Sequence, residues 1–254
     1  MNRFSIVIVC KNEAEALQRT LPGWQRVTDD IVLYDNGSTD DTLTVAKQYP
    51  NVHIQQGPWM GFGATKQKAV ALARYDWVLS IDADEALDEM LQQQLVTLHL
   101  TDPKTVYDIR FKTFLGNKEL KWGEWGGDHH IRLFNRTYVN WNDAPVHETL
   151  IIPHDTNVQK LTGYILHYTM NDMAEYSTKM TRYALLNAEK YFAQDKKASW
   201  LKRYMGGPFA FIKYYIFLFG FLDGWEGLVC ARMTAYYTSL KYARLYELQS
   251  AGNP

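Results

Sequence analysis

The sequence has little that would place the chain in a specialised class of protein. Its two cysteines, Cys10 and Cys230, stand far apart in apolar surroundings, and neither has metal-site spacing. We expect both to be buried, reduced thiols, which favours a reducing compartment. Charges of the two signs nearly cancel, giving a formal net charge of -1. No overall attraction to nucleic acid is therefore expected, and any anionic partner must be bound locally.

A secretion signal, an internal repeat and a low-complexity segment are also missing. The first apolar run, at residues 4–10, ends at Lys11-Asn12-Glu13 and has no small-residue cleavage site after it. It is too short and too soon followed by charge for a signal peptide, so we interpret it as the first core strand and expect a cytoplasmic protein. The composition, 46% hydrophobic and 22% charged, is that of a globular protein with a full core.

Short apolar runs and helical patterns alternate through the amino-terminal part. We predict strands at residues 4–10, 30–34, 52–56 and 77–81, and helices at 13–21, 40–48, 65–74 and 88–98. This alternation predicts a mostly parallel sheet with helices on both faces. Residues 105–168 show short β-like runs, which predict further mixed or antiparallel strands. After Asn171 we predict helices as far as Gln249, with breaks at 205–208 and 223–224.

Asp82-Ala83-Asp84 directly follows the predicted strand at 77–81. Alternate residues of a strand point the same way, so both carboxylates are expected on one side of its carboxyl end. Two carboxylates so close repel unless a positive charge lies between them, and their hard oxygens suit Mg²⁺ or Mn²⁺, which usually hold a substrate diphosphate as well. The alternative is that Asp84 starts a turn and Asp82 is only solvated. Polar clusters also follow the first two strands, where ligands of such sheets bind, and this favours a functional site.

Two further loops have residues suited to a nucleotide. Asp35, the first residue after the second strand, could accept hydrogen bonds from a base or ribose, although Gly37 also fits an ordinary capped turn there. Residues 61–68 resemble a phosphate loop but lack the spacing of a Walker loop. Lys66 or Lys68, at the start of the next helix, could still reach a diphosphate.

Acids, histidines and an arginine lie among aromatic residues and glycines at positions 122–134. An acid in such surroundings can have a raised pKa suited to proton abstraction, and Glu124 and Asp128 are the candidates. A surface loop in which Arg132 pairs with a neighbouring carboxylate is the alternative. His147, which precedes an acid, could be a third metal ligand or a histidine satisfied by hydrogen bonding.

The stretch 209–222 is apolar nearly all round and is interrupted only by Lys213. It is shorter than the roughly 18 to 20 residues that span a bilayer. Its start is surrounded by the basic residues Lys196, Lys197, Lys202 and Arg203. Such a helix could lie in a membrane interface beside anionic lipid; a homodimer interface or a core helix is the alternative.

Three of these motifs together resemble a known family. Residues 9–13, 35–40 and 82–84, in that order and spacing, look like those of the family 2 inverting glycosyltransferases. Residues 127–134 and 146–148, together with the aromatic stretch 209–222, resemble the β-glucosyltransferases that build the lipopolysaccharide or lipooligosaccharide inner core of Gram-negative bacteria. The resemblance implies an α/β fold: a glycosyltransferase-A (Rossmann-like) mixed sheet flanked by helices, with a helical C-terminal extension. We expect the catalytic domain at 1–170 and a membrane or dimer contact at 171–254.

The resemblance also implies how the donor is bound. Asn12 and Glu13 would line the uridine pocket, and Asp35 would bind the uracil. Asp82 would contact the ribose side of the donor. Lys66 occupies the place of residues near the base and the phosphates.

For catalysis, the resemblance implies that Asp84 holds Mg²⁺ or Mn²⁺, with His147 as the further candidate ligand. The general base would be Asp128, with Arg132 nearby. Many family members have Glu-Asp where this chain has Gly127-Asp128, and that departure leaves Glu124 as a rival base.

The implied activity is transfer of a hexose, glucose in the subgroup, from a UDP-sugar to a lipopolysaccharide inner-core sugar, on the inner face of the cytoplasmic membrane. A polyprenyl-phosphate sugar synthase is an alternative, but it would favour fuller transmembrane segments than this sequence has. A peptide glycosyltransferase is another. A non-catalytic nucleotide-sugar sensor would keep Asp35 and Asp82 but need no base.

Overall fold

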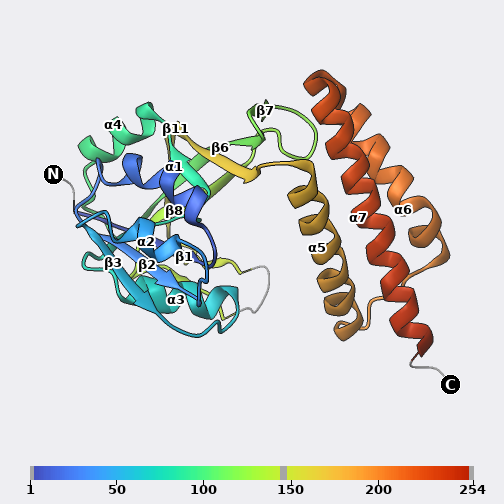
Figure 1. Ribbon diagram of the computed structural model, residues 1–254, viewed down its shortest axis with the longest axis horizontal. Coiled ribbons are helices and arrows are strands. Elements are labelled where there is room, and N and C mark those ends of the chain that lie inside the picture. Colours follow the sequence, from blue (N-terminus) through green and yellow to red (C-terminus); the bar gives the residue numbers. More distant parts are fainter. Residues whose placement is uncertain (1–2, 144–147, 252–254) are drawn as a thin grey trace. The chain divides into compact units, whose positions relative to one another are not determined.

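The computed structural model describes residues 3–143 and 148–251. Contacts within the chain divide it into two compact units (Figure 1). The first consists of residues 1–111 and 128–168, and the second of residues 112–127 and 169–254. The second unit thus takes in a segment, 112–127, that lies inside the catalytic domain expected from the sequence.

The first unit is built on a mixed sheet with the strand order β3-β2-β1-β4-β8-β6-β11-β5. β1 pairs in parallel with β2 and β4, and β2 with β3, whereas β8 runs antiparallel to β4 and β6, and β5 antiparallel to β11. β9 and β10 form a separate antiparallel pair. The strands are β1 (Ser5–Cys10), β2 (Ile31–Asp35), β3 (Val52–Gln56), β4 (Trp77–Ser80), β5 (Glu85–Leu87), β6 (Thr105–Leu115), β8 (His129–Asn135), β9 (Asn140–Trp141), β10 (Leu150–Ile151) and β11 (Asn157–Met170).

Helices cover both faces of this sheet. Alternate residues of β1 show the division: Ile6 and Ile8 belong to one core cluster and Val7 to the other. The first cluster contains residues of α1 (Ala14–Trp24), α2 (Thr42–Ala46) and α4 (Glu89–Thr97), and the second contains residues of α3 (Phe62–Ala71). The predicted α/β fold, a mixed sheet flanked by helices and followed by a helical extension, is confirmed.

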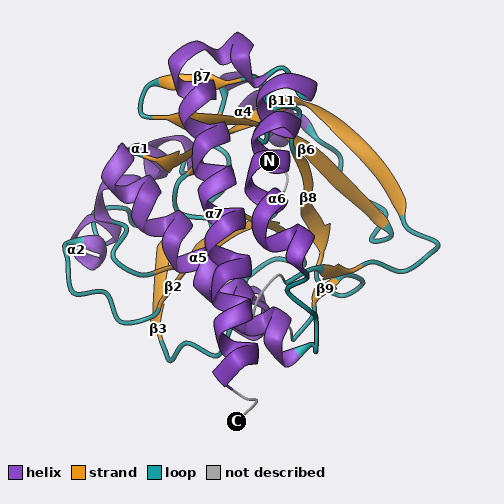
Figure 2. Cartoon of the chain, turned by 90° about the vertical axis from the view of Figure 1, so that its right-hand side faces the viewer, coloured by secondary structure: helices purple, strands orange, loops and turns teal. Residues whose placement is uncertain are grey.

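The second unit is mainly helical, and α7 packs against both α5 and α6 (Figure 2). Its elements are β7 (Lys118–Leu120), which pairs with the end of β6, then α5 (Met173–Ala193), α6 (Trp200–Ile212), the π-helical turn η1 (Lys213–Phe217), the 3₁₀ turn η2 (Gly220–Asp223) and α7 (Gly224–Ala251). The break predicted at 223–224 is confirmed, since η2 ends and α7 begins there.

The break predicted at 205–208 is wrong, because α6 continues through these residues. A side chain at Gly207 would place its Cβ 2.1 Å from Ser239 Oγ of α7, and one at Gly206 would lie 3.3 Å from Thr238. The two glycines therefore allow close helix packing rather than a turn. Pro208 lies inside this helix, although its nitrogen has no hydrogen to donate.

Candidate active site

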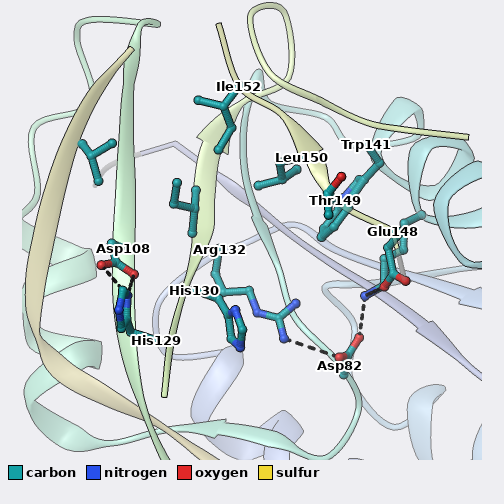
Figure 3. A pocket seen from close by; sticks show the side chains of 13 residues that line it. Asp82, Asp108, His129, His130, Arg132, Trp141, Glu148, Thr149, Leu150 and Ile152 are labelled. Atoms are coloured by element: carbon teal, nitrogen blue, oxygen red, sulfur yellow. Dashed lines mark hydrogen bonds and ion pairs between the residues drawn. The ribbon is translucent and has the colours of Figure 1, made fainter. Parts of the chain in front are cut away.

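Asp82 follows β4 and lies at the centre of an ion-pair cluster (Figure 3). Its Oδ1 is 3.1 Å from Nζ of Lys66 on α3, and its Oδ2 is 3.5 Å from Nη2 of Arg132 on β8. Lys66 Nζ also lies 2.9 Å from Oε1 of Glu148. The Asp82 side chain keeps 40% of its surface exposed, so a ligand can still reach this carboxylate.

Each charge in this cluster stabilises the ionised form of its partner. Burial alone would raise the pKa of Asp82, but Lys66 and Arg132 outweigh it and hold that pKa well below its usual range. Burial would likewise lower the pKa of Lys66, and the carboxylates of Asp82 and Glu148 raise it instead. The protein therefore supplies cations that offset the repulsion between the carboxylates of the Asp82-Ala83-Asp84 motif.

Glu85, at the start of β5, is a buried member of the site that the sequence analysis missed. Its Oε1 accepts a hydrogen bond from Arg132 Nη2 at 2.5 Å, and its Oε2 accepts one from the backbone N–H of Asp82 at 3.1 Å. Burial raises the pKa of Glu85 to about 7, although Arg132 acts against this. Through these two bonds, Glu85 holds the turn that contains Asp82 and Asp84 against Arg132. Its signal in the sequence was an acid directly after the two aspartates, in a run that follows a buried strand.

Asp84 lies beside a histidine that the sequence analysis also missed. Its Oδ2 is 3.4 Å from Nε2 of His167 on β11, and His167 is paired with Glu85 in the β11–β5 register. Burial would lower the pKa of His167, but the bond and charge of Asp84 raise it. Nothing in the sequence beyond a lone histidine in a strand pattern pointed to this residue.

A carboxylate and an imidazole are both ligands for Mn²⁺, and a carboxylate also suits Mg²⁺. Asp84 and His167 are therefore side chains of the kind that could contribute ligands to a divalent ion. No group of three or more His, Cys, Asp or Glu side chains suited to a metal occurs within residues 3–143 and 148–251. His147, the ligand suggested by the sequence, lies outside the described residues.

Asp128 directly precedes β8 and pairs with His130, the Nε2–Oδ1 distance being 3.1 Å. The hydrogen bond from His130 lowers the pKa of Asp128, so this carboxylate is ionised at neutral pH. His130 and Arg132 are alternate residues of one strand, and both lie close to Phe111. The centroid of the Phe111 ring is 5.2 Å from the imidazole centroid of His130 and 5.3 Å from the guanidinium carbon of Arg132. Within the first unit, Asp128 is thus linked through His130 to the face of β8 that bears Arg132.

Glu124 belongs to the second unit. Its carboxylate accepts a hydrogen bond from the hydroxyl of Thr234 on α7. Burial raises the pKa of Glu124, and the Thr234 bond offsets this only in part. A structural role, holding the segment 112–127 to α7, accounts for these contacts.

Asp35 ends β2 with its carboxylate buried. The carboxylate accepts hydrogen bonds from Ser38 N–H at 3.1 Å and from Gln56 Nε2 at 3.1 Å, besides one from the Ser38 hydroxyl at 2.5 Å. Burial alone would raise the pKa of Asp35, but these bonds outweigh it and lower that pKa. Asp35 is therefore a fixed, ionised carboxylate that shapes the loop after β2.

Asn12 and Glu13 join that loop to the end of β1. Asn12 has a φ of 59°, donates from its backbone N–H to Ser38 Oγ at 2.9 Å, and accepts from Thr39 N–H through Oδ1 at 2.8 Å. The backbone N–H of Glu13 donates to Thr42 Oγ1 at 2.8 Å. The three residues expected to contact the nucleoside thus meet at the carboxyl ends of neighbouring strands.

A pocket of about 550 Å³ opens beside the Asp82 cluster. Lys66, Asp82 and Glu148 line one end, while Asp108 and His129, whose carboxylate and imidazole lie 2.8 Å apart, line the other (Figure 3). This volume lies within the range of small-molecule sites. A sugar-sized ligand could therefore contact the charged cluster and the face of β8 together.

The sequence of this chain is similar to those of glycosyltransferases. The sequence model described as "Glycosyl transferase family 2" matches residues 5–154. The lipopolysaccharide core biosynthesis glycosyltransferase LpsC of Rhizobium meliloti is 26% identical over 96% of this chain and 92% of its own length. An uncharacterised glycosyltransferase of Rickettsia typhi is 27% identical over 98% of this chain and 88% of its own length. Among solved structures, S. aureus TarS 1-349 superposes with a TM-score of 0.49 and 13% identity, over 99% of this chain and 92% of that one.

Proposed function

The chain belongs to glycosyl transferase family 2, and from this premise we propose that it is an inverting glycosyltransferase that moves glucose from a UDP-sugar to an inner-core sugar of lipopolysaccharide. The observation that carries the proposal is the pocket beside Asp82, with Asp84 in the same turn and Asp128 directly before the neighbouring strand β8. Similarity to a lipopolysaccharide core glycosyltransferase over nearly the whole chain supports this class of acceptor.

The donor is assigned to the carboxyl ends of β1, β2 and β4. Asn12, Glu13 and Asp35 would surround the nucleoside, and Asp82 would contact the ribose. Lys66, held by Asp82 and Glu148, supplies a positive charge close to the diphosphate. Since Lys66 is already paired with two carboxylates, it acts by balancing charge in the cluster as well as by attracting the donor.

Asp128 is assigned as the general base. It accepts the proton of the acceptor hydroxyl as that oxygen forms a bond to the anomeric carbon of the donor, while the bond from this carbon to the UDP oxygen breaks. The lowered pKa of Asp128 keeps it in the ionised form that accepts a proton. Attack from the face opposite UDP inverts the anomeric centre, so an α-linked donor gives a β-linked product.

Asp84 and His167 are the side chains that would hold the divalent ion. When bound, Mg²⁺ or Mn²⁺ neutralises charge on the diphosphate leaving group. Arg132 adds a fixed positive charge to the cluster, through its contacts with Asp82 and Glu85. An acceptor of this kind would be met at a membrane surface.

The test is a donor screen with UDP-sugars, with and without Mn²⁺, against truncated lipopolysaccharide acceptors. We expect the fastest transfer from UDP-glucose, and only with the metal present. Transfer of glucose to a polyprenyl phosphate or a peptide, but to no core acceptor, would contradict the acceptor assignment. UDP-sugar binding without transfer to any acceptor would favour a sensor instead.

A further inference from the structure

The outward face of α6 and of η1 is apolar along its length. The large hydrophobic side chains on it are between 41% and 68% exposed, and they recur at helical spacing. They are Trp200, Leu201, Tyr204, Met205, Phe209, Ile212, Ile216 and Phe217. A surface helix of a globular protein normally turns its polar side outward, so this helix has the reverse orientation.

Close packing fixes this orientation. Gly207 lies against Ser239 and the backbone of Ala235 on α7, and Gly206 lies against Thr238 on the same helix. A rotation of α6 that buried its aromatic side would push large side chains into the place of these glycines. The apolar side is therefore held outward by the packing of the second unit itself.

The apolar face continues past the end of α6 to the start of α7. Leu218, Phe219, Phe221, Leu222 and Trp225 are between 40% and 66% exposed. We call these residues, together with the outward face of α6 and η1, the aromatic face. An exposed apolar surface of this kind marks an interaction site.

Of the described residues, no single helix has the length and hydropathy needed to cross a membrane, and only Trp200–Phe217 and Gly220–Ala251, bent by 71° from each other, meet those criteria as a pair.

The charges around the aromatic face are mainly positive: Asp223 is buried, and the acids at its flanks are Asp195 and Glu226. Residues 196–222 contain five lysines and arginines and no aspartate or glutamate, although the whole chain has a net charge of -1. Lys213 is exposed within the aromatic face. Tryptophan and tyrosine side chains, such as Trp200, Tyr204 and Trp225, favour the boundary between water and lipid. This combination of apolar area, positive charge and aromatic rings complements an anionic bilayer surface.

A second copy of the chain is a poorer occupant. A symmetric contact would bring the five basic residues of 196–222 near their own copies, with only the flanking Asp195 and Glu226 to pair with them. On a bilayer, Lys213 can instead extend its ammonium group to the phosphates while its stem stays among apolar atoms.

We propose that the aromatic face seats the protein on an anionic phospholipid bilayer, with α6 lying in the plane of the interface and its outward side chains inserted among the lipids. The inference goes beyond the transfer reaction and depends on neither the donor nor the acceptor.

Vesicle flotation tests it. The intact protein should float with vesicles of equal parts phosphatidylglycerol and phosphatidylcholine, and more weakly with phosphatidylcholine alone or at high salt. Phe209→Ser combined with Phe217→Ser should weaken binding at least about tenfold, because two exposed aromatic side chains no longer insert. Met90→Ser combined with Val96→Ser, two exposed apolar residues of α4, is the matched control and should bind as the wild type does.

Lack of flotation by the wild-type protein at any salt concentration would overturn the inference. So would unchanged binding of the Phe209/Phe217 variant, or an equal loss in the α4 control. Light scattering supplies a further check. If the wild type is a dimer that does not bind vesicles, and the Phe209/Phe217 variant is a monomer, the aromatic face is a contact with a second copy of the chain. Transfer to a lipid-free acceptor, measured on the same variants, separates the two proposals, since flotation without any transfer would count against the proposed function alone.

Discussion

Lys66 Nζ on α3 lies 3.1 Å from Oδ1 of Asp82. The same ammonium group lies 2.9 Å from Oε1 of Glu148, so one buried lysine joins three separate segments of the chain. The lysine expected to reach a diphosphate is therefore also the partner that keeps Asp82 ionised. On the proposed assignment, donor binding and the stability of the first unit would depend on the same charge.

Replacing Lys66 with methionine should lower the free energy of unfolding by about 3 kcal/mol, because Asp82 and Glu148 would lose a buried partner. Lys68→Met, an exposed lysine of the same helix, is the control and should change it by less than about 0.5 kcal/mol. Urea denaturation measures both. Equal stability of the two variants would show that the ion pairs of Lys66 do not hold the site together.

Asp128→Asn should lower kcat at least about 100-fold, because the amide cannot accept the proton of the acceptor hydroxyl. The KM for the donor should stay nearly unchanged, since Asp128 is not assigned to donor binding. Glu124→Gln is the matched comparison and should retain most of the activity, because its carboxylate is bonded to Thr234 in the second unit. Steady-state kinetics with varied donor distinguish the two, and the reverse pattern would make Glu124 the base.

The pH profile should reflect the contact between His130 and Asp128. That contact lowers the pKa of Asp128 below its ordinary value of 3.8, and the base must be ionised to work. In His130→Ala the pKa should rise, so the pH at which kcat/KM falls to half its plateau should move upward. His129→Ala, whose imidazole pairs with Asp108, should leave this acid limb in place. A limb that moves in neither variant would argue against Asp128 as the titrating group.

Metal affinity should depend on Asp84 and His167. In the presence of UDP, Asp84→Asn and His167→Gln should each weaken Mn²⁺ binding at least about tenfold, as followed by electron paramagnetic resonance of the free ion. Asp76→Asn, an exposed carboxylate paired with Arg136, should bind Mn²⁺ as the wild type does. Wild-type affinity in both site variants would place the metal elsewhere.

Much of the first unit follows from local sequence patterns. The strand predicted at 52–56 coincides with β3, and the strands predicted at 4–10, 30–34 and 77–81 differ from β1, β2 and β4 by a residue at one or both ends. The runs that became β1, β2 and β4 are short, mostly apolar and buried, whereas β3 alternates apolar and polar residues at strand period. β5 was missed because it has only three residues and is held by pairing with the distant β11.

The sequence named several members of the site. Asp35 ends a strand, Asp82 and Asp84 follow one, and their position at one edge follows from the parallel order of the sheet. Lys66 and Arg132 were also candidates, although their partners were not foreseen. The pairings of Lys66 with Glu148, of Arg132 with Glu85 and of His167 with Asp84 join residues that are far apart along the chain, and no local pattern encodes them. The continuous α6 was missed for a similar reason, since the glycines that suggest a turn serve packing against α7.

The most direct test of the account is the anomeric configuration of the product made from α-linked UDP-glucose and a truncated lipopolysaccharide core, determined by NMR for the wild type and for Asp128→Asn. The account predicts a β-linked glucose from the wild type and almost no product from the variant. An α-linked product, or a β-linked product formed at the same rate by both proteins, would contradict it.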